Sequence, residues 1–256
     1  MKISVVIPTF NRPDLLEKLL VSIKDQTLQV FEVIIINDNS KNKDVYDDVI
    51  IKYNEFFKIK YIFLNHNKGA QFCRNLGLLV AEGDYVCFTD DDDYWANTKI
   101  AKQLEIAKEK GSDLVFSWAK VVDESGAFIG SYEFNGNPEE IKKIILSGCV
   151  IPSPTVMVKR DFILDIGGFD ESLESCQDWD MWIRMIHNDA QISCTMTYEA
   201  FYLKHNRGSI GLSNRALLGY AKIYKKHILK SRYNWRFLFS AFKFFIKRPK
   251  LIFILK

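Results

Sequence analysis

Four consecutive aspartates at residues 90–93 are the side chains in this sequence best suited to do chemistry. Adjacent carboxylates repel one another and raise each other's pKa unless a cation neutralises them. A divalent cation is held by one or two carboxylates and takes substrate phosphates as further ligands. The alternative is a solvated acidic loop that caps the next helix. Because the run directly follows the apolar residues 85–89 and precedes Tyr94 and Trp95, we favour the metal site.

Two further polar segments follow apolar, strand-like runs. Thr9 and Asn11 come after residues 3–7, and Asp38 comes after residues 33–36. In an open parallel sheet, ligands bind outside the carboxyl ends of the strands. We therefore expect the three polar loops to converge on one edge of the sheet and to form one site.

Several common phosphate and metal sites do not fit this pattern. An EF-hand loop needs ligands or a glycine turn where Tyr94 and Thr98 stand. A phosphatase with an aspartate nucleophile needs acids after the first strand, where Pro8 and Thr9 stand. The sequence has neither a P-loop nor a G-x-G-x-x-G motif, so the usual nucleoside triphosphate and dinucleotide cradles are absent.

Strand-like and helix-like segments alternate through the first half of the chain, which predicts the scaffold for these loops. Short β-branched runs imply buried strands, and apolar residues at helical spacing imply helices between them. This alternation indicates an α/β fold with a mostly parallel central sheet flanked by helices. In the first half we expect strands at 3–7, 33–36, 60–64, 85–89 and 114–118, separated by helices from 11 to 23, around 45–57, at 70–81 and at 98–110. After these we expect a hairpin at 126–138, helices at 139–146 and 179–188, and a helical tail from 216.

Composition agrees with a globular protein. Of 256 residues, 48% are hydrophobic, which is enough for a substantial core. No window approaches the roughly 18 uninterrupted apolar residues of a membrane span. The five cysteines are widely spaced and odd in number, which favours reduced thiols over disulfides or a metal site. With no export signal at the start, we expect a cytoplasmic protein.

The charge distribution separates a basic tail from the rest of the chain. Residues 200–256 contain 14 Lys and Arg and no Asp or Glu, although the net charge of the whole chain is only +3. Aromatic residues are interleaved with these bases, as in amphipathic helices at membrane interfaces. We expect the tail, residues 216–256, to bind an anionic membrane surface. A helix packed on the domain is the alternative, and the absence of a recognised motif argues against nucleic acid.

Seven segments, in matching order over about residues 2–210, resemble the motifs of family 2 inverting glycosyltransferases with the GT-A fold. They are SVVIPTFNR at 4–12, INDNS at 36–40, NKGAQFCRNLG at 67–77, FTDDDDYW at 88–95, GGFDE at 167–171, QDWDMW at 177–182 and YLKHNRGS at 202–209. The resemblance implies transfer of a sugar from a nucleotide diphosphate, such as a UDP-sugar, to an acceptor hydroxyl. It also implies a glycosyltransferase domain at 1–215.

The resemblance assigns roles to the first polar loops. Pro8, Thr9 and Asn11 would line the nucleoside pocket. Asp38 would accept a hydrogen bond from the base, commonly uracil. Arg74 would reach the base or the diphosphate.

The aspartate run would serve the donor and the metal. Asp90 would hold the ribose or the sugar, and Asp92 would bind Mn²⁺ or Mg²⁺ that bridges the phosphates. Asp91 and Asp93 are assigned to the donor side, Asp93 through the sugar or an ion-bound water.

The later motifs would supply the base and close the site. Asp178 matches the catalytic base, with Asp180 as its rival, since Asp-x-Asp at a helix start can equally cap the helix. Gln177 replaces an acidic residue that is usual in the family. His205 would complete the metal site or contact the diphosphate, and Arg207 and Ser209 would lie in a loop that closes over the donor.

The expected function is therefore metal-dependent sugar transfer to a glycan or lipid-linked glycan in surface polysaccharide synthesis. The enzyme would be peripheral to the inner face of the cell membrane. A sugar-nucleotide-binding or membrane-surface module without turnover is the alternative from another class. A nucleotidyltransferase is less favoured because its Gly-rich first loop is missing.

Overall fold

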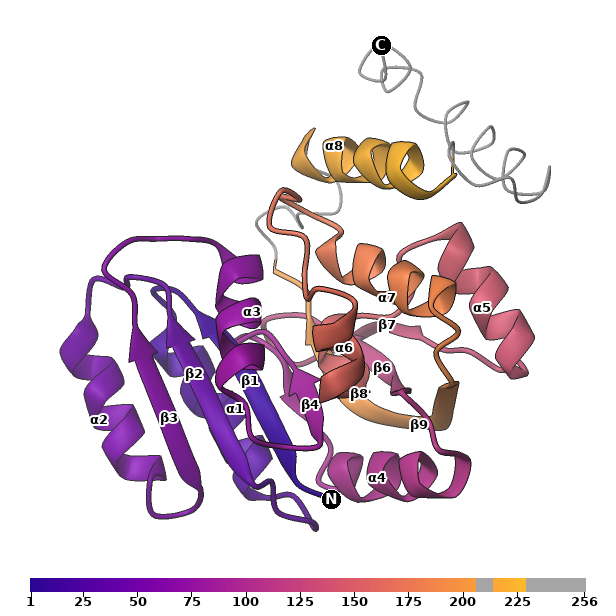
Figure 1. Ribbon diagram of the computed structural model, residues 1–256. Coiled ribbons are helices and arrows are strands. Elements are labelled where there is room, and N and C mark those ends of the chain that lie inside the picture. Colours follow the sequence, from indigo (N-terminus) through magenta and orange to yellow (C-terminus); the bar gives the residue numbers. More distant parts are fainter. Residues whose placement is uncertain (206–213, 229–256) are drawn as a thin grey trace.

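The computed structural model describes residues 1–205 and 214–228, which form a central sheet flanked by helices (Figure 1). The sheet has nine strands in the order β3-β2-β1-β4-β8-β6-β9-β5, and β7 pairs with β6 outside this path. The strands are β1 (Ile3–Thr9), β2 (Glu32–Asn37), β3 (Lys58–Phe63), β4 (Tyr85–Phe88), β5 (Tyr94–Trp95), β6 (Leu114–Val122), β7 (Phe128–Tyr132), β8 (Val156–Lys159) and β9 (Ile192–Leu203). The helices are α1 (Pro13–Lys24), α2 (Lys43–Tyr53), α3 (Ala70–Val80), α4 (Lys99–Lys110), α5 (Pro138–Ser147), α6 (Arg160–Asp165), α7 (Gln177–His187) and α8 (Asn214–Ile223), with a 3-10 turn (Ser153–Thr155) and a π-helix (Tyr224–Ile228).

The first four strands are parallel and place the predicted polar loops together. β1 lies between β2 and β4, and β2 pairs with β3. Every residue of β1, β2 and β4 is buried, because helices cover both faces of this part of the sheet. The chain leaves these three strands at the same edge, so the segments after Thr9, Asn37 and Phe88 adjoin one another.

The second half of the sheet is mixed. β8 runs antiparallel to both β4 and β6, whereas β9 runs parallel to β6. The α/β fold with a central sheet between helices is thus confirmed, and its all-parallel part comprises β3, β2, β1 and β4. The long strand β9 was not predicted. Its register shifts against β6 between Phe116 and Ala119, so its buried and exposed positions do not alternate regularly.

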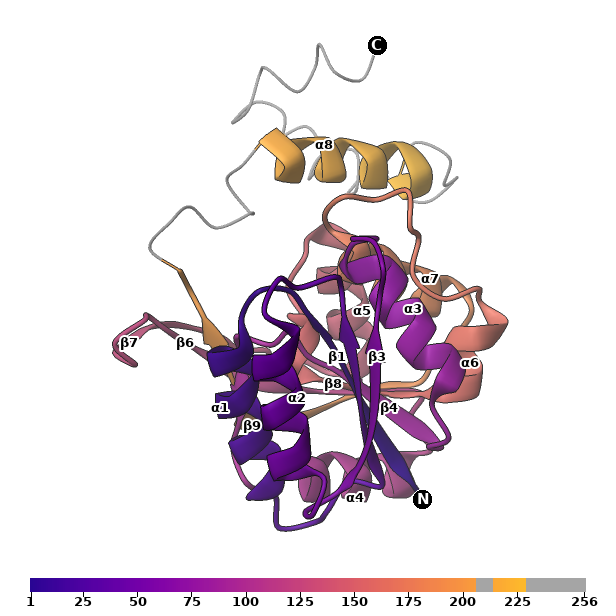
Figure 2. The same ribbon diagram turned by 90° about the vertical axis from the view of Figure 1, so that its left-hand side faces the viewer.

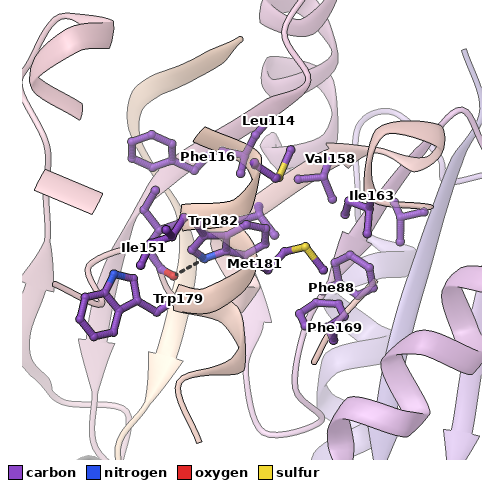
Figure 3. Close-up of a cluster of buried hydrophobic side chains, with 14 of the residues drawn as sticks. Phe88, Leu114, Phe116, Ile151, Val158, Ile163, Phe169, Trp179, Met181 and Trp182 are labelled. Atoms are coloured by element: carbon purple, nitrogen blue, oxygen red, sulfur yellow. Dashed lines mark hydrogen bonds between the residues drawn. The ribbon is translucent and has the colours of Figure 1, made fainter. Parts of the chain in front are cut away.

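Alternate strand residues contribute side chains to two hydrophobic cores on opposite faces of the sheet. Figure 2 shows α1 and α2 on one side of the strands and α3 and α6 on the other. The core on the α3 side also contains α5 and α7, with Trp179 and Trp182 among its largest buried side chains (Figure 3). The indole of Trp182 donates a hydrogen bond to the Ile151 carbonyl over 3.1 Å. These two indoles and Phe169 are core residues.

Helix α8 lies at one end of the molecule, next to α7 (Figures 1 and 2). The rings of Tyr220 and Tyr224 pack on Trp179 with centroid distances of 5.3 and 5.9 Å. Residues 216–228 of the predicted tail are therefore helical and packed on the domain, and residues 229–256 lie outside the described part. Among the described residues no helix has the length and apolar character needed to cross a membrane.

Candidate active site

The loop after β4 turns one of its four aspartates into the protein. Asp91 is fully buried and accepts a hydrogen bond from the Thr9 hydroxyl over 2.7 Å. Its other oxygen lies 2.8 Å from the guanidinium of Arg12. Burial raises the pKa of Asp91 to about 7, although Arg12 and Thr9 oppose this shift. Asp91 thus ties the aspartate loop to the end of β1, and its predicted contact with the donor stays a prediction.

The other three aspartates gather their oxygens in one place. One carboxylate oxygen each from Asp90, Asp92 and Asp93 lies within 4.8 Å of the others. Asp93 is only 2% exposed, and one of its oxygens accepts the Leu203 amide over 3.1 Å. Its second oxygen is buried without a hydrogen-bond partner in the described part of the chain. Burial, and then repulsion from its aspartate neighbours, raises the pKa of Asp93 well above its usual range. This all-oxygen cluster with an unpaired buried atom fits a hard divalent cation.

Asp92 contacts two cationic or ionisable groups. The Arg12 guanidinium lies 2.5 Å from one oxygen of Asp92, and Nε2 of His205 lies 2.8 Å from the same oxygen. His205 follows the last residues of β9, and its Nδ1 lies 3.4 Å from Glu124. His205, predicted to complete the metal site or to contact the diphosphate, thus lies in direct contact with Asp92, and its role stays a prediction. The role of Arg12 was not predicted, although its position directly after the PTFN segment could have suggested it.

A small cavity lies over the ends of β1 and β2. Its volume is ≈ 80 Å³. It is lined by Pro8, Thr9, Phe10, Arg12, Asp38, Ala70, Cys73 and Asp90. The Asp38 carboxylate accepts the backbone amides of Lys68 over 2.7 Å and Gly69 over 2.9 Å. Gly69 has φ of +88°, a conformation that favours glycine, and it directly precedes α3. Asp38 therefore fixes the turn that leads into α3 while it faces the cavity.

Asn11 does not line this cavity. Its backbone amide donates to the Ser40 hydroxyl over 2.8 Å, and its side-chain oxygen accepts the Lys41 amide over 2.9 Å. Asn11 itself has φ of +55°, which asparagine tolerates better than most residues. It thus joins the loops after β1 and β2, and its predicted contact with a nucleoside stays a prediction.

A second cavity of ≈ 200 Å³ adjoins the first, since Asp90 lines both. Its walls come from segments that are far apart in the sequence. They are Arg74, Asp90, Tyr132, Cys149, residues 152–154, residues 174–178 and Tyr202. The 152–154 segment, with two prolines, contributes a short stretch of the chain to this lining. Tyr132 and Tyr202 were missed because they belong to β7 and to the unpredicted β9, which both pair with β6 and so bring the two rings together, 6.0 Å apart between centroids.

Arg74 brings a buried positive charge to the second cavity. The residue is 3% exposed, and Nη2 forms an ion pair with Asp90. Its Nε and Nη1 atoms are buried without a hydrogen-bond partner within residues 1–205 and 214–228. The guanidinium also lies 5.7 Å from the centre of the Phe169 ring. Unpaired buried donors of this kind are suited to bind an anionic group.

Asp178 lies in the first turn of α7 and faces the same cavity. One of its oxygens accepts the Trp179 amide over 2.8 Å, and the Cys149 thiol donates to that oxygen over 3.6 Å. Burial raises the pKa of Asp178 above the usual aspartate value, despite the opposing amide and the charge of Arg74. A carboxylate with a raised pKa is a stronger proton acceptor, as a general base requires.

Asp180, the rival base, has different surroundings. It is fully buried and lines neither cavity. Its carboxylate lies 2.8 Å from Arg184, 2.8 Å from Lys226 and 2.7 Å from His227. Burial by itself would raise its pKa, but the hydrogen bonds from His227, Lys226 and Arg184 outweigh burial and lower it. A paired carboxylate of this kind is a weak proton acceptor.

The structure thus brings together most of the predicted site residues. Pro8, Thr9, Asp38 and Asp90 line the small cavity, and Arg74, Asp90 and Asp178 line the larger one. Asp92, Asp93 and His205 form the cluster beside them. Arg207 and Ser209 lie outside the described residues.

Comparison with known proteins agrees with this geometry. Residues 4–166 match Glycosyl transferase family 2. The uncharacterized glycosyltransferase MJ1057 of Methanocaldococcus jannaschii is 30% identical over 98% of this chain and 90% of its own length. The chain therefore belongs to glycosyl transferase family 2, and the protein is a glycosyltransferase.

Two further similarities concern a bacterial enzyme and a solved structure. The UDP-Glc:alpha-D-GlcNAc-diphosphoundecaprenol beta-1,3-glucosyltransferase WfaP of Escherichia coli is 28% identical over 90% of this chain and 86% of its own length. The crystal structure of S. aureus TarS 1-349 in complex with UDP-GlcNAc has a TM-score of 0.77 and is 23% identical, covering 95% of this chain and 73% of that chain. The latter similarity supports the GT-A fold.

Proposed function

We propose that this glycosyltransferase is a metal-dependent inverting enzyme that moves a sugar from a nucleotide diphosphate, most simply a UDP-sugar, to a hydroxyl of a glycan or lipid-linked glycan. One observation carries the proposal. Asp38 and Asp178 lie in two adjoining cavities that share Asp90. A donor that spans both cavities has its nucleoside beside Asp38 and its sugar beside Asp178.

The chemistry follows from the side chains of the larger cavity. Asp178 takes the proton from the acceptor hydroxyl as its oxygen bonds to the anomeric carbon of the sugar. The bond from that carbon to the diphosphate breaks on the opposite face, so the configuration inverts and the nucleoside diphosphate leaves with the bonding electrons. General base catalysis of this kind contributes on the order of 10²–10⁴-fold. Arg74, two of whose buried donors have no partner among the described residues, stands beside Asp90 to bind the anionic leaving group.

The oxygen cluster provides the cation site that this chemistry favours. Asp90, Asp92 and Asp93, together with His205, would hold Mn²⁺ or Mg²⁺. When bound, the ion stabilises the negative charge that develops on the departing diphosphate. Asp91 would not bind the ion itself but would fix the aspartate loop through its contacts with Thr9 and Arg12.

Relatives support the classes of donor and acceptor. WfaP is named for a UDP-Glc donor and a diphosphoundecaprenol-linked acceptor. The putative teichuronic acid biosynthesis glycosyltransferase TuaG of Bacillus subtilis is 32% identical over 62% of this chain. By this analogy the present enzyme extends a surface polysaccharide on a lipid-linked acceptor.

A transfer assay tests the proposal. The protein is incubated with UDP-sugars, Mn²⁺ and a lipid-linked glycan, and the released nucleotide and the anomeric configuration of the product are measured. We expect UDP release that requires Mn²⁺ and disappears in Asp92→Ala, with an inverted product. The exposed Asp161→Ala is the matched control. Nucleotide binding without turnover on any donor would instead identify a binding module, and release of pyrophosphate would identify a nucleotidyltransferase.

The basic tail supports a cytoplasmic location, peripheral to the inner face of the membrane. Residues 229–256 combine Lys and Arg with aromatic residues and contain no acidic residue. Each base near anionic lipid contributes about 1 kcal/mol to binding. Deletion of residues 234–256 should move the protein from the membrane fraction to the supernatant and should abolish its binding to phosphatidylserine vesicles. Equal partition of the full and shortened chains would refute the membrane proposal while leaving the transfer proposal intact.

A further inference from the structure

Residues 214–228, called here the C-terminal segment, pack on the wall that carries Asp178. This wall comprises residues 174–178, which line the larger cavity. Gly219 of α8 is so close to the wall that a Cβ atom there would lie 2.1 Å from the Ser175 hydroxyl. The Lys222 ammonium donates to the Ser172 carbonyl over 3.0 Å. The C-terminal segment therefore packs against the residues that form one wall of the cavity.

The strongest contacts come from the π-helix. Lys226 lies 2.6 Å from Asp170 and 2.8 Å from Asp180, and it thus joins the loop before α7 to the helix itself. His227 is buried and lies 2.7 Å from the same oxygen of Asp180. Single π-helical turns inside helices occur frequently at functional sites. Here the wider turn brings two consecutive side chains, Lys226 and His227, to one buried carboxylate.

Asp180 links these contacts to the proposed base. It lies two residues after Asp178 in the first turn of α7, and its carboxylate is fully buried. A buried carboxylate is costly unless partners compensate its charge, so the geometry of α7 at this turn depends on those partners. Arg184 comes from α7 itself and ties this helix to the Ile166 and Gly168 carbonyls of the preceding segment, whereas Lys226 and His227 attach Asp180 to the C-terminal segment.

We propose that Lys226 and His227 are positioning residues, which hold the first turn of α7 through Asp180 so that Asp178 faces the cavity. The C-terminal segment is then part of the active site and not only a connection to the tail. This inference rests on the proposed role of Asp178. It also gives a role to the buried carboxylate of Asp180, which takes no part in the proposed transfer reaction.

Steady-state kinetics of Lys226→Met and His227→Phe in the full chain test this inference. The small cavity with Asp38 includes no residue of the C-terminal segment, so binding of UDP, measured by calorimetry, should stay at the wild-type value. Misplacement of the base should lower kcat about 10-fold or more with the donor KM unchanged. Lys226→Arg should restore kcat, and the exposed neighbour Lys225→Met should leave kcat at the wild-type value.

The kcat and the UDP affinity of these variants together decide whether Lys226 and His227 position the base. Wild-type kcat in both variants, or an equal loss of UDP binding and kcat, would overturn the positioning role. If the single variants do not fold, the double variant Asp180→Asn/Lys226→Met removes the buried charge together with one partner; a lowered kcat supports the inference and a wild-type kcat overturns it. Asp178→Asn, measured in parallel, keeps the two proposals apart, because wild-type kcat in that variant refutes the base itself.

Discussion

The guanidinium of Arg12 lies 2.5 Å from the carboxylate of Asp92, the residue proposed to bind the metal ion. A second nitrogen of Arg12 lies 2.8 Å from Asp91. One side chain, directly before α1, thus places a single positive charge against two of the four consecutive aspartates. Its positive charge occupies the neighbourhood in which a divalent cation would bind, so arginine and cation compete for the same oxygen atoms.

Replacement of Arg12 by methionine should therefore strengthen the binding of Mn²⁺ to the nucleotide-free protein. We expect an increase in affinity of about tenfold, because loss of a competing charge beside a cation site is worth on the order of 1 kcal/mol at partly exposed positions. Titration followed by electron paramagnetic resonance measures free Mn²⁺ directly. Arg12→Lys, which keeps the charge, should bind Mn²⁺ nearly as the wild type does. Weaker binding in Arg12→Met would contradict the competition.

Asp38→Asn should weaken the binding of UDP by about tenfold or more. The carboxylate accepts two backbone amides at the start of α3, and an asparagine side chain offers only one acceptor oxygen in its place. Loss of one charge-assisted hydrogen bond in a buried site costs about 1.5–3 kcal/mol. Calorimetric titration with UDP provides the measurement, and the exposed Asp44→Asn in α2 is the control. Unchanged affinity would remove Asp38 from the nucleotide site.

Gly77→Ala should destabilise the fold. A Cβ atom at residue 77 would lie 2.3 Å from a methyl carbon of Val6, which is fully buried in β1. Alanine is favoured over glycine in a helix by about 1 kcal/mol, but overpacking against a rigid strand costs about 1–3 kcal/mol, so the clash should prevail. Urea unfolding gives the free energy. Gly130→Ala, where a Cβ atom would meet nothing within 4 Å, should be nearly neutral.

Asp180 should contribute to stability in a pH-dependent manner. Hydrogen bonds from His227, Lys226 and Arg184 hold its pKa below the usual value in the folded protein, in spite of burial. Its contribution is therefore present above the unfolded pKa of about 4 and is lost as the pH falls below that value. Asp180→Asn should lower the unfolding free energy by about 3 kcal/mol near neutral pH, and the difference should shrink in acid.

Urea titrations at several pH values measure this difference. The exposed Asp161→Asn serves as the control, since its carboxylate forms only a surface ion pair with Arg160. A difference between Asp180→Asn and wild type that is constant with pH would show that packing, and not charge, accounts for the loss.

Much of the site could be predicted because its residues directly follow buried strands. The runs that form β1, β2 and β4 are apolar on both faces, and the polar residues after them fall at one edge by the rule for parallel sheets. Gly77 could likewise be assigned to packing, since a glycine in an apolar helix indicates close approach.

The rest depends on contacts between distant segments. Strand β9, and with it Tyr202, was missed because residues 195–197 and a register shift interrupt its alternation. The roles of Arg12 and of Asp180 are set by which charged groups lie opposite them, and those groups are 80 and 47 residues away. Sequence spacing within one segment does not contain this information.

The measurement that tests the central claim most directly is the kinetics of Asp178→Asn with a UDP-sugar donor, Mn²⁺ and a glycan acceptor. The amide keeps the shape of the side chain but cannot accept the proton. We expect kcat to fall by about 10²-fold or more while UDP binds as in the wild type, and the remaining product to be inverted. Wild-type kcat in Asp178→Asn, or a product with retained configuration, would contradict the account.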